Sequence, residues 1–300
     1  MTRHSDIALT ALAPIIWGST YFVTTEFLPQ GYPVTMAMLR ALPAGLLLLI
    51  LVRELPRGIW WLRMLVLGAL NFTIFWTLLF VAAYKLPGGV AATVGAIQPL
   101  IVIFLARLML TIPIQTQSIL AALAGIFGVA LLVLSPSSAL DPLGIAAGLG
   151  GAASMATGSV LTRKWQPPTS LLTYTAWQLT AGGLLLVPLA FWLEPALPPL
   201  SLTNLTGLVW LSLFGAVFTY LVWFRGITKI ELSVVSMLGF LSPTAAVIIG
   251  WTLLDEHLTA LQITGALIVL ASIWFSQHTS SAPIKARITK QSSLNIESKT

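Results

Sequence analysis

Polar and aromatic side chains at the centres of long apolar segments are the residues of this chain best placed to bind another molecule. A polar group in such surroundings costs free energy unless it finds a partner or water, so it marks a candidate site. The candidate residues are Trp17, Tyr21, Arg40, Asn71, Trp76, Gln98, Trp177, Gln178, Tyr220 and Trp223.

Arg40 is the charged candidate, and it lies roughly 9 Å inside its apolar segment at 1.5 Å per helical residue. A planar guanidinium with five donors suits a carboxylate or another anion, which is the functional interpretation. Alternatively, the side chain extends to lipid headgroups or joins helix ends through backbone carbonyls. The modest depth of Arg40 favours the structural interpretation.

Pro99 and Pro243 are predicted structural hinges, because a proline inside a helix removes a backbone donor and frees a carbonyl. Gln98 directly precedes Pro99, whereas Ser242 precedes Pro243. An amide beside such a bend suits a cavity for a small molecule. Gln98 could equally hydrogen-bond across helices and hold them together.

The aromatic candidates also allow two interpretations. Tryptophan is common where a helix meets the membrane surface, and Trp60 and Trp192 near segment ends fit that role. Trp17 and Tyr21 are four residues apart and therefore share one face of a helix. For these two residues we favour a position beside a cavity.

The composition of the chain decides what kind of elements position these side chains. The chain has 300 residues, of which 57% are apolar and 8% are charged. Soluble domains carry roughly 25% charged residues, so this chain belongs in a lipid bilayer. Apolar runs of about 20 residues predict an all-α integral membrane fold of ten helices. Their ranges are 7–27, 34–52, 61–83, 89–110, 117–134, 143–162, 171–193, 207–224, 232–254 and 260–277.

The basic residues predict the orientation of the helices. With the N-terminus in the cytoplasm, thirteen of the fifteen Lys and Arg residues lie on the cytoplasmic side, Lys85 lies outside and Arg40 lies within a helix. This follows the positive-inside rule, so we expect a multi-pass protein of a bacterial-type inner membrane with both termini cytoplasmic. The scattered basic residues form no stripe for nucleic acid. Residues 279–300 are polar without an apolar period and predict a disordered cytoplasmic tail.

The chain repeats itself about 144 residues apart. Residues 83–90 and 98–100 (AYKLPGGV and QPL) align with residues 227–234 and 242–244 (ITKIELSV and SPT). Five helices per copy reverse the second copy in the membrane, so the sequence predicts two inverted five-helix repeats, at 1–136 and 137–278. Many secondary transporters bind substrate between repeats of this kind.

Several motifs together resemble the drug/metabolite transporter superfamily and, within it, the EamA-type transporters. They are WGSTY at 17–21, LRA at 39–41, AYKLPGGVAA at 83–92, QPL at 98–100, GW at 250–251 and LDE at 254–256. The resemblance is strongest to the PecM-like subgroup, which is associated with export of a blue pigment. It implies a ten-helix exporter of a small metabolite, such as an amino-acid-derived or aromatic compound. One departure is that residues 110–112 (LTI) lack the acidic turn found at 254–256.

Other functions find less support in the sequence. There is no cysteine, and His4, His257 and His278 lie at helix ends or beyond, so we expect no catalytic residue, metal or cofactor. No carboxylate lies at mid-membrane as a proton relay, and no phosphate-binding loop indicates ATP use. A membrane sensor and, less readily, a membrane-embedded enzyme remain alternatives. The expected partners are a small molecule and lipid, with the chain as a monomer or weak homodimer.

Overall fold

The computed structural model describes residues 3–86, 88–133, 141–253 and 259–279, except for the side chains at 21, 83, 84, 88–90, 278 and 279. All elements in these residues are helices, and two of them are single turns of π-helix. The elements are α1 (Arg3–Phe27), α2 (Pro33–Val52), α3 (Trp60–Gly68), η1 (Ala69–Ile74), α4 (Phe75–Lys85), α5 (Gly88–Gly95), α6 (Gln98–Leu110), α7 (Thr116–Val133), α8 (Pro142–Lys164), α9 (Leu171–Leu193), α10 (Leu202–Ser212), η2 (Leu213–Phe218), α11 (Thr219–Lys229), α12 (Leu232–Leu238), α13 (Leu241–Leu253) and α14 (Ala260–Thr279).

The described helices form ten continuous or nearly continuous rods that are long and apolar enough to cross a membrane. This confirms the predicted all-α membrane fold. The largest difference in bounds is the eighth rod, predicted at 207–224 and observed over Leu202–Lys229. Polar residues extend both of its ends. Ser201 and Asn204 form a capping box at its start, and Arg225 and Lys229 lie in its last turns.

The helix is interrupted before each of the two predicted hinge prolines. α5 ends at Gly95 and α6 begins at Gln98, so Pro99 lies in the first helical turn, where its missing N–H has no intrahelical bond to lose. In the second half, α12 ends at Leu238, and Pro243 lies near the start of α13. The prolines therefore begin new helices, whereas the sequence suggested bends within continuous ones.

The π-helical turns η1 and η2 interrupt the third and eighth rods. Leu213 follows Ala69 by 144 residues, which is the offset found between the sequence repeats. A π turn bonds each residue to the fifth one along the chain instead of the fourth. Neighbouring carbonyls consequently become available to side chains from other helices.

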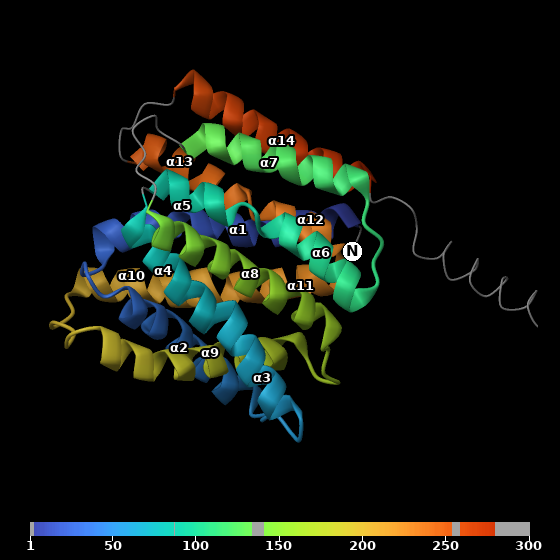
Figure 1. The fold of residues 1–300 in the computed structure, drawn as a ribbon. Coiled ribbons are helices and arrows are strands. Elements are labelled where there is room, and N and C mark those ends of the chain that lie inside the picture. Colours follow the sequence, from blue (N-terminus) through green and yellow to red (C-terminus); the bar gives the residue numbers. More distant parts are fainter. Residues whose placement is uncertain (1–2, 87, 134–140, 254–258, 280–300) are drawn as a thin grey trace, which may run out of the picture.

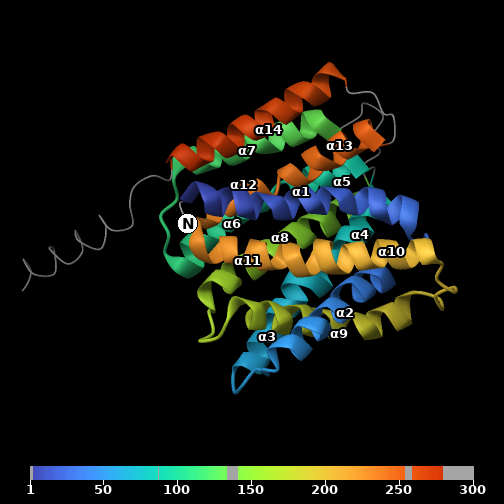
Figure 2. The ribbon, with the colours of Figure 1, turned by 180° about the vertical axis from the view of Figure 1, so that it is seen from behind.

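Helices from the two halves of the chain interleave. α2 packs along α9 and α7 packs along α14, on opposite sides of the bundle (Figures 1 and 2). Between these pairs, α1 packs on α11 and α13, and α8 packs on α4 and α6. Gly45 permits the close approach of α2, since a Cβ there would lie 2.5 Å from the Thr180 backbone nitrogen. Small residues at these contacts let backbones meet where lipid offers no hydrophobic drive for association.

The glycines of α8 serve contacts within the chain. A Cβ on Gly144 would lie 2.6 Å from Leu86, and one on Gly148 would lie 2.8 Å from Val94. Their spacing matches a common pattern for helix pairing in membranes. Here that pattern packs α8 against α4 and α5, in the interior of the bundle.

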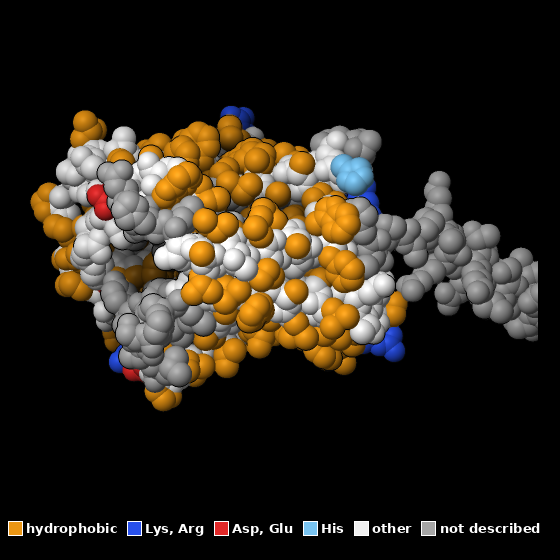
Figure 3. Space-filling model, turned by 90° about the horizontal axis from the view of Figure 1, so that it is seen from above, with side chains coloured by type: hydrophobic (Ala, Val, Ile, Leu, Met, Phe, Trp, Pro, Cys, Tyr) orange, Lys and Arg blue, Asp and Glu red, His pale blue; other side chains and the backbone are white. Residues whose placement is uncertain are grey.

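The outer surface is apolar along the helices. The face formed by α7 and α14 carries mainly hydrophobic side chains, with charged side chains at its two ends (Figure 3). Leu120 and Phe127 of α7 and Leu267 of α14 are among the exposed ones. Large exposed side chains of this kind suit contact with lipid tails, and they support a multi-pass membrane protein.

Candidate substrate site

Six side chains from five elements meet in the middle of the bundle, and we call them the central cluster. Three of the aromatic rings are fully buried, with Phe72 0%, Tyr220 1% and Trp223 2% exposed. The members of the central cluster are Trp17 of α1, Arg40 of α2, Phe72 of η1, Trp76 of α4, and Tyr220 and Trp223 of α11.

The rings of the central cluster touch in tilted or edge-to-face pairs. The Tyr220 centroid lies 4.6 Å from that of Phe72 and 5.2 Å from that of Trp17. Trp17 also contacts Trp223 at 5.1 Å, and Phe72 contacts Trp76 at 5.4 Å. None of these pairs is stacked face to face. Tilted and edge-to-face arrangements are the favoured geometries of aromatic pairs.

Arg40 is buried, with 9% of its surface exposed. Its Nη2 donates to the Gly215 carbonyl at 2.5 Å, and its guanidinium lies 4.9 Å from the centroid of the Trp76 ring. The side chain therefore does not extend to the lipid headgroups, which was one of its predicted roles. Contact with a backbone carbonyl, the other structural role, is present. Nε nevertheless has no hydrogen-bond partner among the described residues.

The Gly215 carbonyl is the acceptor on which several donors converge. It accepts from Arg40, from Trp17 Nε1 at 3.2 Å and from Thr219 Oγ1 at 2.8 Å. Gly215 lies within η2, where the π turn changes the backbone bonding. The lack of a side chain also matters, because a Cβ would come within 3.3 Å of Arg40 Nη2.

A second polar group lies at η1 and consists of two neutral amides, which we call the amide pair. Asn71 Nδ2 donates to Gln178 Oε1 at 2.8 Å and to Thr162 Oγ1 at 3.3 Å. Both amides are completely buried. Asn71 Oδ1 and Gln178 Nε2 have no partner among the described residues, so the amide pair keeps unused hydrogen-bonding capacity.

The structure thus gathers five of the ten predicted residues in the central cluster and two in the amide pair. Trp177 lies elsewhere, because neighbouring residues on a helix point about 100° apart. Its Nε1 donates to the Glu54 carbonyl at 2.7 Å, near one end of α9. Gln98 is partly buried at the start of α6. Tyr21 lies in α1, and its side chain is outside the described part of the chain.

Four residues of the site escaped the sequence prediction. Phe72 resembled an ordinary apolar residue, and Thr162 and Thr219 are common packing residues in membrane helices. Gly215 offers only a backbone group. The repeat offset of 144 pairs Gly215 with Asn71, and this alignment could have indicated it.

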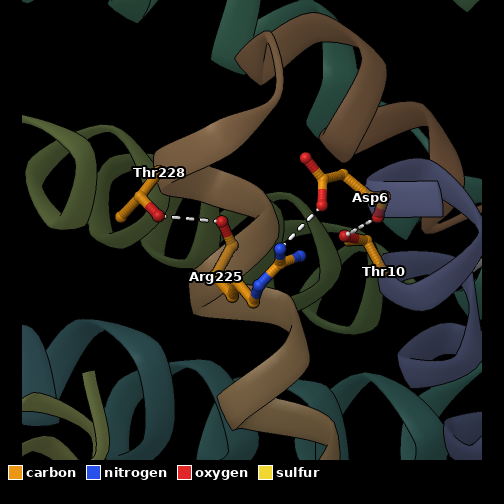
Figure 4. A network of polar contacts seen from close by, with 4 residues as sticks. All are labelled: Asp6, Thr10, Arg225 and Thr228. Carbon is orange, nitrogen blue, oxygen red and sulfur yellow. Dashed lines mark hydrogen bonds and ion pairs between the residues drawn. The ribbon is translucent and has the colours of Figure 1, made fainter. Parts of the chain in front are cut away.

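A separate polar network joins α1 to α11 at the end of the bundle where the chain begins (Figure 4). Arg225 Nη2 donates to the Asp6 carboxylate at 2.7 Å, and Thr10 Oγ1 donates to the Asp6 carbonyl at 2.7 Å. Arg163 of α8 reaches the same end and donates to the carbonyls of Ile227 and Ile230. These bonds draw α1, α8 and α11 together at that end.

A cavity of about 210 Å³ opens beside the loop between α8 and α9. It lies beside the C-terminal end of α11, and none of the predicted site residues lines it. Its lining residues are Gln166, Pro167, Thr169, Leu171, Tyr174, Thr228 and Lys229.

The chemistry of the central cluster and the amide pair is that of binding. Both offer hydrogen-bond donors and ring faces, whereas nucleophilic catalysis needs a base beside the nucleophile. Within the described ranges, no three His, Cys, Asp or Glu side chains come together as metal ligands.

Comparison with known proteins agrees with the fold. The model of the EamA-like transporter family matches residues 5–134 and again residues 142–276. Protein PecM of Dickeya dadantii is 44% identical over 270 residues, covering 89% of this chain and 91% of that protein. The uncharacterized transporter YvbV of Bacillus subtilis is 28% identical and covers 93% of this chain and 94% of its own length.

A solved crystal structure has the same fold. It superposes with a TM-score of 0.81 at 16% sequence identity, covering 93% of this chain and 98% of that one. Another relative, the uncharacterized inner membrane transporter YedA of Escherichia coli K12, is 28% identical over 255 residues. On the strength of the two family matches and the long alignment with PecM, this chain belongs to the EamA-like transporter family.

Proposed function

We propose that the chain exports a small metabolite across an inner membrane, and that the metabolite is an amino-acid-derived or aromatic compound, including conjugated pigments. The observation that carries this proposal is the central cluster, where helices from both halves bring an arginine and five aromatic rings together. Buried donors with unused capacity lie among these rings. A flat molecule with a few polar groups matches such a lining.

Alternating access between two inverted repeats would move this metabolite. Three features support the duplication: the two segments matched by one family model, the π turns 144 residues apart, and the helix breaks before Pro99 and Pro243. Exchanging the halves also maps the observed contacts onto each other. The contact of α1 with α13 then becomes that of α8 with α6. The central cluster lies between the parts that would rock.

The proposed orientation identifies the end of the bundle at which export would start. Thirteen basic residues on one side support a cytoplasmic position for both termini under the positive-inside rule. In that orientation, the network of Asp6, Arg163 and Arg225 lies at the cytoplasmic end. For export, the metabolite would enter the bundle at this end.

Uptake into inside-out membrane vesicles tests the proposed function. Vesicles from cells that express the chain are offered a panel of aromatic, amino-acid-derived compounds, and their contents are measured by mass spectrometry. We expect at least one unmodified compound to accumulate above the level in vesicles without the chain. If no compound accumulates, or if one is chemically converted, the transport proposal is contradicted.

A pair of variants assigns the activity to the central cluster. Tyr220→Ala removes a buried ring that contacts Trp17 and Phe72, and we expect it to abolish accumulation. Trp192→Ala is the matched control, because Trp192 is 84% exposed on the surface of α9. Both variants are compared at equal amounts in the membrane. Equal loss in both would remove the central cluster from the proposal.

A further inference from the structure

The positive charge of Arg40 has only neutral partners in this structure. Its guanidinium contacts the Gly215 carbonyl and the Trp76 ring, and no carboxylate of the described residues pairs with it. Burying an unpaired charge within a membrane protein costs free energy, and a cation at such a depth commonly marks a ligand path. A carbonyl dipole and a ring compensate a full charge less well than an anion does.

The unused polar atoms at the centre of this cluster are both donors. Arg40 Nε and Trp223 Nε1 are buried and lack a partner among the described residues. Each of these atoms can donate a hydrogen bond and cannot accept one. The missing ligand atoms are therefore acceptors, such as the oxygens of a carboxylate.

The surroundings of these donors define the rest of the ligand. Trp17 contacts Tyr220 and Trp223 at 5.1 to 5.2 Å between centroids, with the rings tilted by 49° to 59°. Tyr220 and Trp223 are buried, so a ligand ring reaches them only when the surrounding helices separate. The amide pair at η1, by contrast, brings no charge to the site.

We propose that the central cluster binds a planar aromatic anion, with an oxyanion such as a carboxylate on Arg40 and the ring against Trp17, Tyr220 and Trp223. This inference rests on the proposed function and names its substrate class. The anion replaces the Gly215 carbonyl as the main partner of Arg40, because a bond between opposite charges is stronger than a bond from the guanidinium to a neutral carbonyl. A planar guanidinium can bind both carboxylate oxygens at once.

Two probes with the same ring test this assignment. 2-Aminobenzoate is an anion at neutral pH, and 2-aminobenzamide is its neutral counterpart. Binding to the purified full-length chain is followed by tryptophan fluorescence and by the shift in melting temperature. We expect 2-aminobenzoate to bind at least about tenfold more tightly than the amide, as expected for one additional charge-assisted bond. Equal binding of the two probes, or no binding of either, overturns the proposal.

Variants test whether Arg40 is responsible for the preference for 2-aminobenzoate over 2-aminobenzamide. Arg40→Gln removes the charge, and we expect it to make the two probes equivalent. Arg40→Lys retains a charge, so the preference for the anion should persist at reduced strength. Arg63→Gln is the matched control, because Arg63 also lies over a tryptophan, Trp60, but outside the central cluster. Anion preference that survives in Arg40→Gln, or is lost in Arg63→Gln, overturns the proposal.

Two further measurements separate folding from binding and substrate class from transport. If Arg40→Gln does not fold, Arg40→Lys and Trp223→Phe decide, since the second removes an unpaired donor and should weaken the anion selectively. In vesicles, uptake of 2-aminobenzamide without uptake of 2-aminobenzoate would overturn the anion assignment and leave the transport proposal intact. Uptake of the anion alone supports both.

Discussion

The two π turns of this molecule have the same backbone arrangement but meet different chemistry. At η2, the charged Arg40 of α2 binds the carbonyl of Gly215. At η1, the neutral Gln178 of α9 binds the side chain of Asn71. Arg40 aligns with Gln178 at an offset of 138 residues, and Asn71 aligns with Gly215 at an offset of 144. The two sites therefore descend from the same positions if the halves are duplicates. The comparison teaches that only the η2 turn has a charged partner, Arg40, and that a glycine supplies the carbonyl which that charge contacts.

The halves also differ at the helix break before α6, and a substitution there has the largest expected effect on transport. Gln98 stands where the second half has Ser242, and both residues are partly buried. We predict that Gln98→Ala abolishes efflux at normal expression and membrane insertion, whereas Ser242→Ala retains most of it. Efflux from cells at matched protein levels checks both. Unchanged efflux in Gln98→Ala would show that transport does not need this amide.

Placing a charge at η1 tests whether the two sites are interchangeable. Gln178 is completely buried beside the neutral Asn71, so a charge at this position would be held far from water. We predict that Gln178→Arg costs about 3 kcal/mol of stability, the typical cost of an arginine at a helix centre. Gel filtration in detergent should show less folded protein. A variant as stable as the native chain would show that η1 accommodates a charge equally well.

Removing one member of the amide pair should cost less than adding a charge. Asn71→Leu leaves Gln178 Oε1 buried without its donor, for a cost of about 1–3 kcal/mol. Asn71→Leu combined with Gln178→Leu should recover most of that loss, since neither partner is then left unsatisfied. Melting temperatures of the single and double variants measure the coupling. Additive losses would show that the two amides stabilise the fold independently.

The smallest expected effect concerns the ring over Arg40. Trp76→Phe keeps an aromatic face at 4.9 Å but weakens the attraction for the guanidinium, by about 0.5–1 kcal/mol. In an Arg40→Gln background there is no guanidinium, so Trp76→Phe should cost only the free energy of the lost packing. The difference between the two backgrounds isolates the cation–π contribution. No difference would leave the Gly215 carbonyl as the principal support of Arg40.

Hydropathy was sufficient to predict the ten spans, because each apolar run of about 20 residues must be a helix in lipid. The residues that line the centre were harder to predict. Trp177 and Gln178 are adjacent in sequence but separate in space, and only the rotation of α9 against α2 decides which of them meets the centre. The composition did not indicate the π turns, because one extra apolar residue lengthens an apolar run by only one position.

The bonds along α1 have a mechanical consequence for any transport cycle. Asp6 binds Arg225 at one end of α1, and Trp17 binds Thr219 near its middle. Between these points Gly226 lies so close to Thr10 that an added Cβ would come within 2.4 Å of it. These three contacts are spread over a dozen residues of α1 and oppose a pivot of α1 on α11. If helices move during transport, we expect α1 and α11 to move together and the relative motion to occur along another helix contact.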